Sequence, residues 1–282
     1  MTGTEKDNLN VEADSRTWWF APMDRERQVT VSVVSHGQGT LVMALLGDLN
    51  RYSQKRIEVI ITINVMEVLP FDGMDYDFPL RIVRNKRPRG FGANHNAAFA
   101  LRRCPYFCIL NPDIRVDSDP FWPLLSLLAN PKVGVVAPLV RSAEGAVDDS
   151  ARRMPTPLVI FGKVFNRKQG PDYRIGREPI NPDWVAGMFM LFRSDVYAQM
   201  GGFDERYFLY YEDVDLCARM ALAGYRIVLD PSVSVIHDAR RESHRNFSYF
   251  RRHIASITRF FLSRVFFRYM LKRVRMRNGA SA

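Results

Sequence analysis

Residues 106–113 read Tyr-Phe-Cys-Ile-Leu-Asn-Pro-Asp, an apolar run of strand length that ends in a polar turn. Because Asn, Pro and Asp commonly end strands, the sequence predicts a strand over 106–110 with Asp113 just beyond its carboxyl end. Similar apolar runs occupy 29–35, 58–64, 80–85 and 133–140, and helical spacing occupies 40–52 and 93–103. Strands that alternate with helices form right-handed crossovers, so the pattern predicts an α/β fold with a mostly parallel central sheet.

The second half of the chain has a less regular pattern. Residues 141–183 are rich in Arg, Pro and Gly and predict loops. After them residues 184–192 are apolar again, and the sequence predicts helices at 194–200 and 213–223 and one or two strands at 225–236. In the first half, Thr40 is expected as the N-cap of the first helix.

The chain has 282 residues and 47% hydrophobic residues, which excludes a disordered or collagen-like protein. Its three cysteines form no CxxC pair, which favours reduced thiols in the cytoplasm. Residues 1–28 form a polar leader that we expect to be flexible and that has no signal-peptide pattern. No apolar run reaches the roughly 18 residues of a membrane span, so we expect a protein that does not cross a bilayer.

The formal net charge of +10 is concentrated at one end of the chain. Twelve of the 40 Lys and Arg residues fall within 240–282, where Glu242 is the one acidic residue, so this segment carries +11 and the rest −1. Apolar residues recur there at helical spacing, at Phe250, Ile254, Ile257, Phe261 and Val265. The pattern predicts a basic amphipathic helix that either lies in an anionic lipid interface or packs on the domain. No nucleic-acid module accompanies the charge, and we expect no nucleic-acid partner.

Ligands of parallel sheets bind beyond the carboxyl ends of the strands, which here means residues 35–39, 63–66, 90–96 and 111–113. A basic loop runs into Gly90 and Gly92 just ahead of a predicted helix, a combination that suits a diphosphate or simply forms a structural loop. Asp113 can hold a divalent ion against phosphate oxygens, or it can belong to a turn that ends the strand.

His237 closes the apolar segment 233–237. If it meets Asp113 in space, carboxylate plus imidazole suits Mn²⁺ or a similar ion; otherwise it is an ordinary surface or core histidine.

Residues 203–217 contain five aromatic residues followed by Glu212, Asp213 and Asp215 at the start of a predicted helix. Crowded carboxylates raise one another's pKa, which is one route to a general base. Alternatively, Glu212 and Asp213 occupy the first helical turn without a chemical role, and Asp215 pairs with Arg219 one turn later. The aromatic residues fit a sugar- or base-lined cleft and fit core packing as well.

In this order the segments resemble family 2 glycosyltransferases, particularly the bacterial rhamnosyltransferase-like branch. The resemblance covers about residues 29–240 and leaves 241–282 as a basic tail. It is carried by Val31-Ser-Val-Val, Gly90-Phe-Gly-Ala-Asn-His-Asn96, Leu110-Asn-Pro-Asp113, Val185-Ala-Gly187-Met-Phe, Gly201-Gly-Phe-Asp-Glu205, residues 208–216, Ala223-Gly-Tyr225 and Val235-Ile-His237.

The resemblance implies a Rossmann-like single domain of GT-A type, an inverting transfer from a nucleotide sugar, and a divalent metal, Mn²⁺ or Mg²⁺. Position by position, it implies an acceptor base at Asp213, with Glu212 as the competing candidate. It implies metal ligands at Asp113 and His237, and an acceptor side at Trp184 and Gly187. The donor-binding residues that it implies are Ser35, Asn64, Gly90, Gly92, Asn96, Asn111 and Asp113.

Two departures from the family pattern leave two hypotheses. Ile63 stands where the family has an Asp that helps to hold the nucleobase, and His36-Gly37 replaces the usual Tyr-Asn. The first hypothesis is a transferase that moves a sugar, with rhamnose expected, from a dTDP or UDP donor to a lipid-linked or cell-surface glycan. It would act at the inner face of the plasma membrane. The second is a non-catalytic member that uses the cleft for binding and the tail for membrane docking.

Overall fold

A computed structural model of the protein describes residues 27–53, 56–70, 76–157, 171–238 and 247–279. Its strands are β1 (Val29–Ser35), β2 (Ile57–Ile63), β3 (Leu80–Arg84), β4 (Tyr106–Leu110), β5 (Ile114–Arg115), β6 (Val133–Ser142), β7 (Ala151–Arg152), β8 (Trp184–Val185), β9 (Phe189–Arg193) and β10 (Arg226–His237). Its helices are α1 (Gly39–Tyr52), α2 (Phe91–Ala100), α3 (Phe121–Leu128), α5 (Ser194–Gln199), α6 (Glu212–Leu222), α7 (Phe247–Phe261) and α8 (Arg264–Gly279). The polar leader predicted for 1–28 lies almost wholly outside the described residues.

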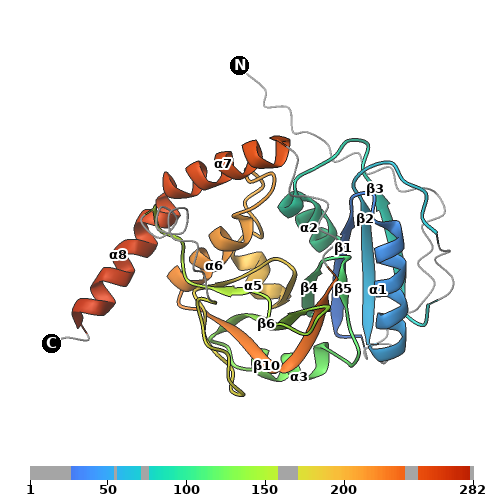
Figure 1. Ribbon diagram of the computed structural model, residues 1–282, viewed down its shortest axis with the longest axis horizontal. Helices are drawn as coiled ribbons and strands as arrows, with labels where there is room; N and C mark the ends of the chain where they lie inside the picture. The colour runs from blue at the N-terminus through green and yellow to red at the C-terminus, as the bar shows by residue number, and fades with distance from the viewer. Residues whose placement is uncertain (1–26, 54–55, 71–75, 158–170, 239–246, 280–282) are drawn as a thin grey trace.

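The centre of the fold is an eight-stranded sheet in the order β3-β2-β1-β4-β9-β6-β10-β5 (Figure 1). Neighbouring strands are parallel except where β9 pairs antiparallel with β4 and β6, and where β5 pairs antiparallel with β10. The predicted α/β class with a mostly parallel sheet is therefore confirmed. Because β1, β2, β4, β6 and β10 run the same way, their carboxyl ends meet at one edge of the sheet.

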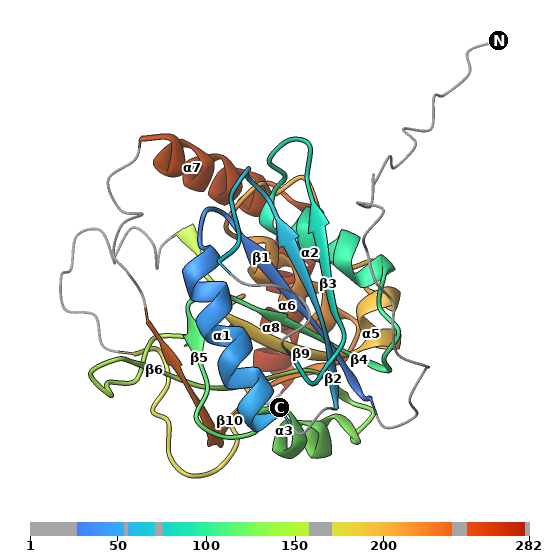
Figure 2. The same cartoon turned by 90° about the vertical axis from the view of Figure 1, so that its right-hand side faces the viewer.

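Two apolar layers enclose the sheet. Helices α1 and α3 cover one face, where alternate β1 residues such as Val31 and Val33 are fully buried against Leu45 and Leu124. Helices α2, α5 and α6 cover the other face around Phe107, Tyr197 and other buried residues (Figure 2). Since both faces are covered, the strands are apolar on both sides, which explains their continuous rather than alternating hydrophobic sequence.

Local differences from the predicted elements have physical causes. Helix α1 begins at Gly39 rather than after a Thr40 cap, because the Glu67 carboxylate accepts hydrogen bonds from the N–H groups of Gly37 and Gly39. That cap comes from a loop 28 residues away and leaves no local sequence pattern. Helix α3 was not expected, since its eight residues are mostly apolar and contain Pro123 in the first turn, where proline is tolerated.

The C-terminal segment forms two helices instead of the single helix predicted. The break follows Phe261, and the Ser263 hydroxyl accepts a hydrogen bond from the Phe266 N–H at the start of α8. Phe260, Phe266 and Tyr269 are buried with Tyr207 and Val214 in a third apolar cluster. Both helices therefore pack on the domain through one side (Figure 1). Within the described residues, none of the helices combines the length and the apolarity needed to span a membrane.

Substitutions at two adjacent glycines can test the packing between α2 and the segment that leads to α6. Gly201 and Gly202 both have positive φ, at 71° and 66°, but a Cβ at Gly201 would have open space, whereas one at Gly202 would overlap the Asn96 side-chain oxygen. We expect Gly201→Ala to lower the free energy of unfolding by about 1 kcal/mol and Gly202→Ala by about 3 kcal/mol. Chemical denaturation measures both, and equal losses would contradict the packing argument.

Candidate active site

A left-handed turn places Asp213 at the start of α6. Tyr210 and Tyr211 both have φ of 70°, a conformation that costs a non-glycine residue on the order of 1 to 3 kcal/mol. Asp213 Oδ1 accepts a hydrogen bond from the Val214 N–H at 2.8 Å, and Oδ2 accepts one from the Gly187 N–H at 3.0 Å. The turn and these two donors fix the carboxylate at the first turn of a helix, where negative charge is favoured.

The neighbouring carboxyl groups of Glu212 and Asp213 have different surroundings in the structure. Glu212 is only 4% exposed, and its Oε2 has no hydrogen-bond partner among the described residues. Burial, followed by the charge of Asp213, raises the pKa of Glu212 well above its ordinary value. Burial also raises the pKa of Asp213, but the N–H groups of Gly187 and Val214 oppose that change. Asp213 is thus the carboxylate of the pair that two backbone N–H groups stabilise, and it is partly exposed. Asp215 forms the expected helical ion pair with Arg219 at 2.7 Å.

Helix α7 packs against the strained turn that precedes Asp213. The Ser256 hydroxyl donates a hydrogen bond to the Leu209 carbonyl at 2.8 Å. The His253 ring lies 4.9 Å from the ring of Tyr210, and the Phe260 ring lies 5.5 Å from that of Tyr211. Helix α7 therefore helps to fix the turn that positions Asp213.

Gly90 and Gly92 of the predicted diphosphate loop pack against the segment 203–208. A Cβ at Gly90 would lie 2.7 Å from the Phe208 carbonyl oxygen, and one at Gly92 would lie 2.6 Å from the Phe203 Cβ. The Phe91 N–H donates to the Phe208 carbonyl at 2.9 Å, so residues 203–208 cover the first turn of α2. The two glycines therefore allow close packing of two chain segments, which is the structural-loop alternative, and donor binding at Gly90 and Gly92 stays a prediction.

Asn96 is also engaged within the protein. Its side-chain oxygen accepts hydrogen bonds from the Tyr197 hydroxyl and the Phe203 N–H, and its amide nitrogen donates to the Phe203 carbonyl. The amide thus anchors residue 203 to α2, a role that the sequence pattern did not distinguish from ligand binding.

Ser35 and Asn64 lie at the carboxyl ends of β1 and β2, as predicted. The Ser35 hydroxyl accepts from the Gln38 N–H at 3.2 Å. Asn64 bonds both backbone polar groups of Arg89, at 2.8 and 3.0 Å, and so holds the basic loop at the sheet edge. Ile63 is buried, and its hydrocarbon side chain cannot form the hydrogen bond to a nucleobase that an Asp would form.

At the same edge, Asp113 and His237 meet. His237 Nε2 lies 3.3 Å from Asp113 Oδ2, and Nδ1 lies 2.8 Å from Asp148 Oδ2. The two carboxylates, that of Asp113 first, raise the pKa of His237 to about 9. Asp113 Oδ1 is buried without a hydrogen-bond partner in the described part of the chain. An unused carboxylate oxygen beside an imidazole fits a divalent cation such as Mn²⁺.

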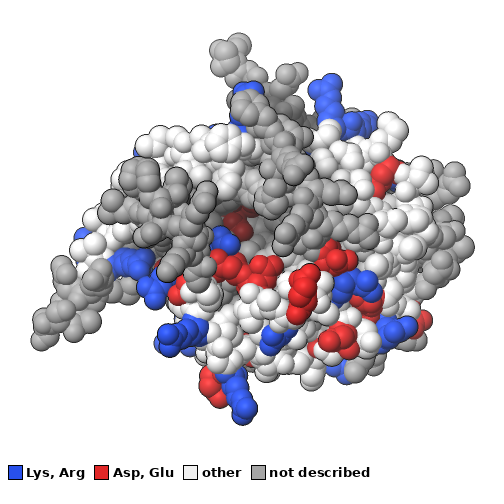
Figure 3. Space-filling view, in the orientation of Figure 1, with Lys and Arg blue, Asp and Glu red and all other residues white. Residues whose placement is uncertain are grey.

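The remaining predicted residues surround these two centres. Asn111 follows β4, and its N–H donates to the Met188 carbonyl, next to Gly187. The Trp184 indole donates to the Arg153 carbonyl at 3.0 Å and borders α6 through the third apolar cluster. Figure 3 shows a hollow on this face with acidic and basic side chains close together. Sequence reasoning missed Asp148 and Glu67, which lie in irregular segments.

Within the described ranges, no three His, Cys, Asp or Glu side chains converge on a single point as a complete metal site. Asp113 and His237 would therefore leave coordination positions for phosphate oxygens and water.

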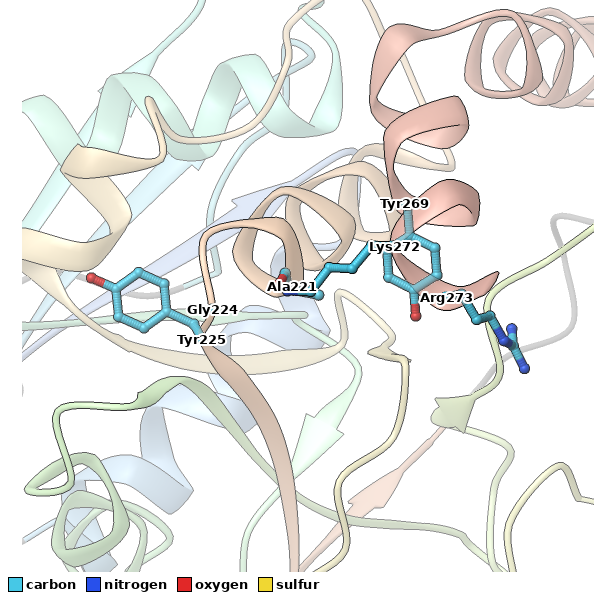
Figure 4. A pocket seen from close by; sticks show the side chains of 6 residues that line it. All are labelled: Ala221, Gly224, Tyr225, Tyr269, Lys272 and Arg273. Atoms are coloured by element: carbon cyan, nitrogen blue, oxygen red, sulfur yellow. Dashed lines mark hydrogen bonds between the residues drawn. The ribbon is translucent and has the colours of Figure 1, made fainter. Parts of the chain in front are cut away.

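A cavity of about 150 Å³ lies elsewhere, between the carboxyl end of α6 and α8 (Figure 4). It is lined by Ala221, Gly224, Tyr225, Tyr269, Lys272 and Arg273. The Lys272 ammonium donates to the Ala221 carbonyl and thereby binds the negative end of the helix. Asp213 sits at the other end of α6, so this cavity is separate from the candidate active site.

Known proteins match this chain in sequence and in fold. The profile "Glycosyl transferase family 2" matches residues 68–200, and "Glycosyltransferase like family 2" matches residues 185–274. The chain is 30% identical over 251 residues to "Rhamnosyltransferase WbbL" of Escherichia coli K12, covering 82% of this chain and 92% of that protein. It is 34% identical over 150 residues to "N-acetylglucosaminyl-diphospho-decaprenol L-rhamnosyltransferase" of Mycobacterium tuberculosis H37Rv, covering 49% of this chain and 48% of that protein.

Solved structures share the fold at lower identity. The mannosyltransferase PcManGT of Pyrobaculum calidifontis, solved with GDP-Man and Mn²⁺, matches with a TM-score of 0.57 and 18% identity over 93% of this chain and 68% of that chain. GalNAc-T7, solved with UDP, GalNAc and Mn²⁺, matches with a TM-score of 0.58 and 13% identity over 78% of this chain and 45% of that chain.

The fold is that of the GT-A class of nucleotide-sugar transferases, and a cluster of carboxylates lies at the carboxyl edge of its sheet. Within that class the chain belongs to glycosyltransferase family 2, and the two relatives named above are rhamnosyltransferases.

A buried histidine beneath the site gives a testable dependence on pH. His95 of α2 is fully buried, and its Nδ1 lies 2.8 Å from the Ser32 hydroxyl. Burial lowers the pKa of His95 to about 3, so it is neutral in the fold, whereas in the unfolded chain it binds a proton below about pH 6.5. The stability that neutral His95 contributes is therefore present above pH 6.5 and is lost as the pH falls toward 3.

We expect His95→Asn, which keeps a partner for Ser32, to show a flatter pH dependence. Between pH 6 and pH 4 the wild type should lose about 1.4 kcal/mol per pH unit more than the variant. Urea titrations at several pH values measure the difference, and parallel curves would show that His95 accepts a proton in the folded state.

Proposed function

We propose that this glycosyltransferase moves rhamnose from a nucleoside-diphosphate donor to a lipid-linked glycan in a single inverting displacement. The observation that carries the proposal is the Asp213 carboxylate, fixed by Gly187 and Val214 at the same sheet edge as the Asp113–His237 pair. The similarity to two rhamnosyltransferases supports rhamnose as the sugar, and the diphospho-decaprenol in the name of one supports a lipid-linked acceptor.

In the proposed reaction Asp213 takes the proton of the acceptor hydroxyl as that oxygen attacks the anomeric carbon. Inversion follows, because one displacement forms the new C–O bond on the face opposite the departing diphosphate. Asp113 and His237 would hold a divalent cation, which neutralises charge on the diphosphate. Asn64 keeps Arg89 and its basic loop beside the strand ends, where positive charge favours an anionic donor.

Buried Ile63 supports the second candidate, a non-catalytic binding protein. It stands in place of the carboxylate with which family members hold the nucleobase of the donor. The two candidates differ in turnover. The transferase should release dTDP from dTDP-rhamnose in the presence of Mn²⁺, and the non-catalytic protein should not. N-acetylglucosaminyl-diphospho-polyprenol is the first acceptor to test.

Asp213→Asn should reduce turnover by about 10²- to 10⁴-fold, because the amide cannot accept the acceptor proton. Glu212→Gln is the matched control: it makes the same carboxyl-to-amide change at the buried neighbour, whose pKa is raised by burial, and turnover should change less than about threefold. Donor binding, measured by thermal shift with dTDP and Mn²⁺, should persist in both variants. A larger loss in Glu212→Gln than in Asp213→Asn would reverse the assignment of the base.

We also propose that the C-terminal helices dock the enzyme on the cytoplasmic face of an anionic membrane. The predicted apolar stripe is divided: Ile257, Phe261 and Val265 are partly buried, whereas Phe250 and Ile254 face outward. Exposed apolar side chains are Phe250 and Ile254 on α7, Leu262 between the helices, and Phe267, Leu271 and Val274 on α8. Exposed arginines accompany them, at 251, 259, 264, 268 and 275. Apolar side chains among cationic ones suit an anionic lipid interface.

The double variant Phe267→Ser/Leu271→Ser should bind vesicles of phosphatidylglycerol and phosphatidylcholine at least about tenfold more weakly in a flotation assay. These two residues are about 60% exposed, so the fold should remain intact. Met66→Ser/Val68→Ser is a matched control with two fully exposed apolar side chains outside α7 and α8. Wild-type binding should weaken with salt. Equal binding by both variants would exclude docking through α8.

A further inference from the structure

His237 faces a carboxylate at each of its ring nitrogens. Nε2 lies 3.3 Å from Asp113 Oδ2, and Nδ1 lies 2.8 Å from Asp148 Oδ2. The proposed transfer gives Asp113 and His237 a role in holding the cation but assigns nothing to Asp148. The shorter of the two contacts is the one that lacks an explanation.

The fold brings Asp148 to this position by a hairpin that follows β6. Ser142 at the end of β6 is paired with His237 at the end of β10. The chain then turns through Gly145, whose φ is 83°, and the Asp148 N–H donates to the Val140 carbonyl at 2.9 Å. The hairpin thus returns Asp148 to the level of the strand end that carries His237.

The Asp148 carboxylate is itself oriented. Its Oδ1 accepts a hydrogen bond from the Asp149 N–H at 2.9 Å, which leaves Oδ2 directed at the imidazole. Nδ1 and Nε2 are on different sides of the ring, so the near oxygen of Asp148 and that of Asp113 are separated by the imidazole. Asp148 is consequently placed to hold the histidine rather than to share a cation with Asp113.

A histidine that binds a cation through Nε2 must carry its remaining proton on Nδ1. An acceptor at Nδ1 selects that tautomer and fixes the plane of the ring, and loss of such an acceptor typically weakens metal binding about 10- to 100-fold. We propose that Asp148 is a positioning residue that fixes His237 as the Nε2 ligand of the divalent cation. The inference rests on the proposed metal-assisted transfer.

The experiment is a double-mutant cycle read by metal affinity. Mn²⁺ binding to the full chain is followed by electron paramagnetic resonance, with Mn²⁺ alone and with Mn²⁺ plus dTDP, for wild type, Asp148→Asn, His237→Gln and the double variant. An asparagine amide can donate to Nδ1 and so favours the tautomer with the proton on Nε2. We expect Asp148→Asn to weaken Mn²⁺ binding 10- to 100-fold. In the His237→Gln background it should have no further effect.

Asp117→Asn is the matched charge control, because Asp117 is exposed four residues after Asp113, and its carboxylate accepts a hydrogen bond from the Ser118 hydroxyl. Its Mn²⁺ affinity should equal that of wild type, and the metal-free melting temperatures should show that each variant is folded. An equal loss from Asp148→Asn with and without His237 would make Asp148 a direct ligand and overturn the proposal, as would wild-type affinity in Asp148→Asn. If the wild type binds dTDP but no Mn²⁺, the metal part of the proposed function fails, and the role of Asp148 fails with it.

Discussion

The hydrogen bond from the Gly187 N–H to Asp213 joins the sheet to the helix that carries the candidate base. Gly187 precedes β9, the antiparallel strand between β4 and β6, so its position is set by the whole middle of the sheet. Asp213 begins α6 after two residues in a left-handed conformation. That strained turn persists because sheet, helix and C-terminal packing all constrain it. The candidate site therefore depends on long-range contacts and would not form in an isolated segment.

Much of the fold was predictable because the information is local and repeated. Apolar runs of strand length alternate with helical spacing from Val29 to Leu110, and the structure has the strands within a residue of the predicted positions. The strand pattern also predicted that Asp113 and His237 lie at one sheet edge. Asp113 follows β4, His237 ends β10, and the two strands run in the same direction. We expected them to be neighbours only if the chain folded in this way, and they lie 3.3 Å apart.

The rest depends on contacts between residues distant in the chain. The carboxylate of Glu67 caps α1 from another loop, and Asp148 reaches His237 across 89 residues of sequence. Likewise, the glycines at 90 and 92 have the same pattern whether a phosphate or an aromatic residue approaches them; here Phe208 and Phe203 do. Charge counting identified the basic tail but not which of its apolar side chains would be buried, because that depends on where the cluster around Tyr207 lies.

Helix α7 has two sides with different neighbours. One side contacts the turn before Asp213 through Ser256, His253 and Phe260, and the other presents Phe250 and Ile254 to solvent. For anyone who prepares this enzyme, the basic C-terminus is a tempting place to shorten the chain for better solubility. Such a truncated protein would lose the support of the turn before Asp213, so a loss of activity would not show whether a lipid surface is required. Substitutions confined to the outer side of the helix keep the two questions apart.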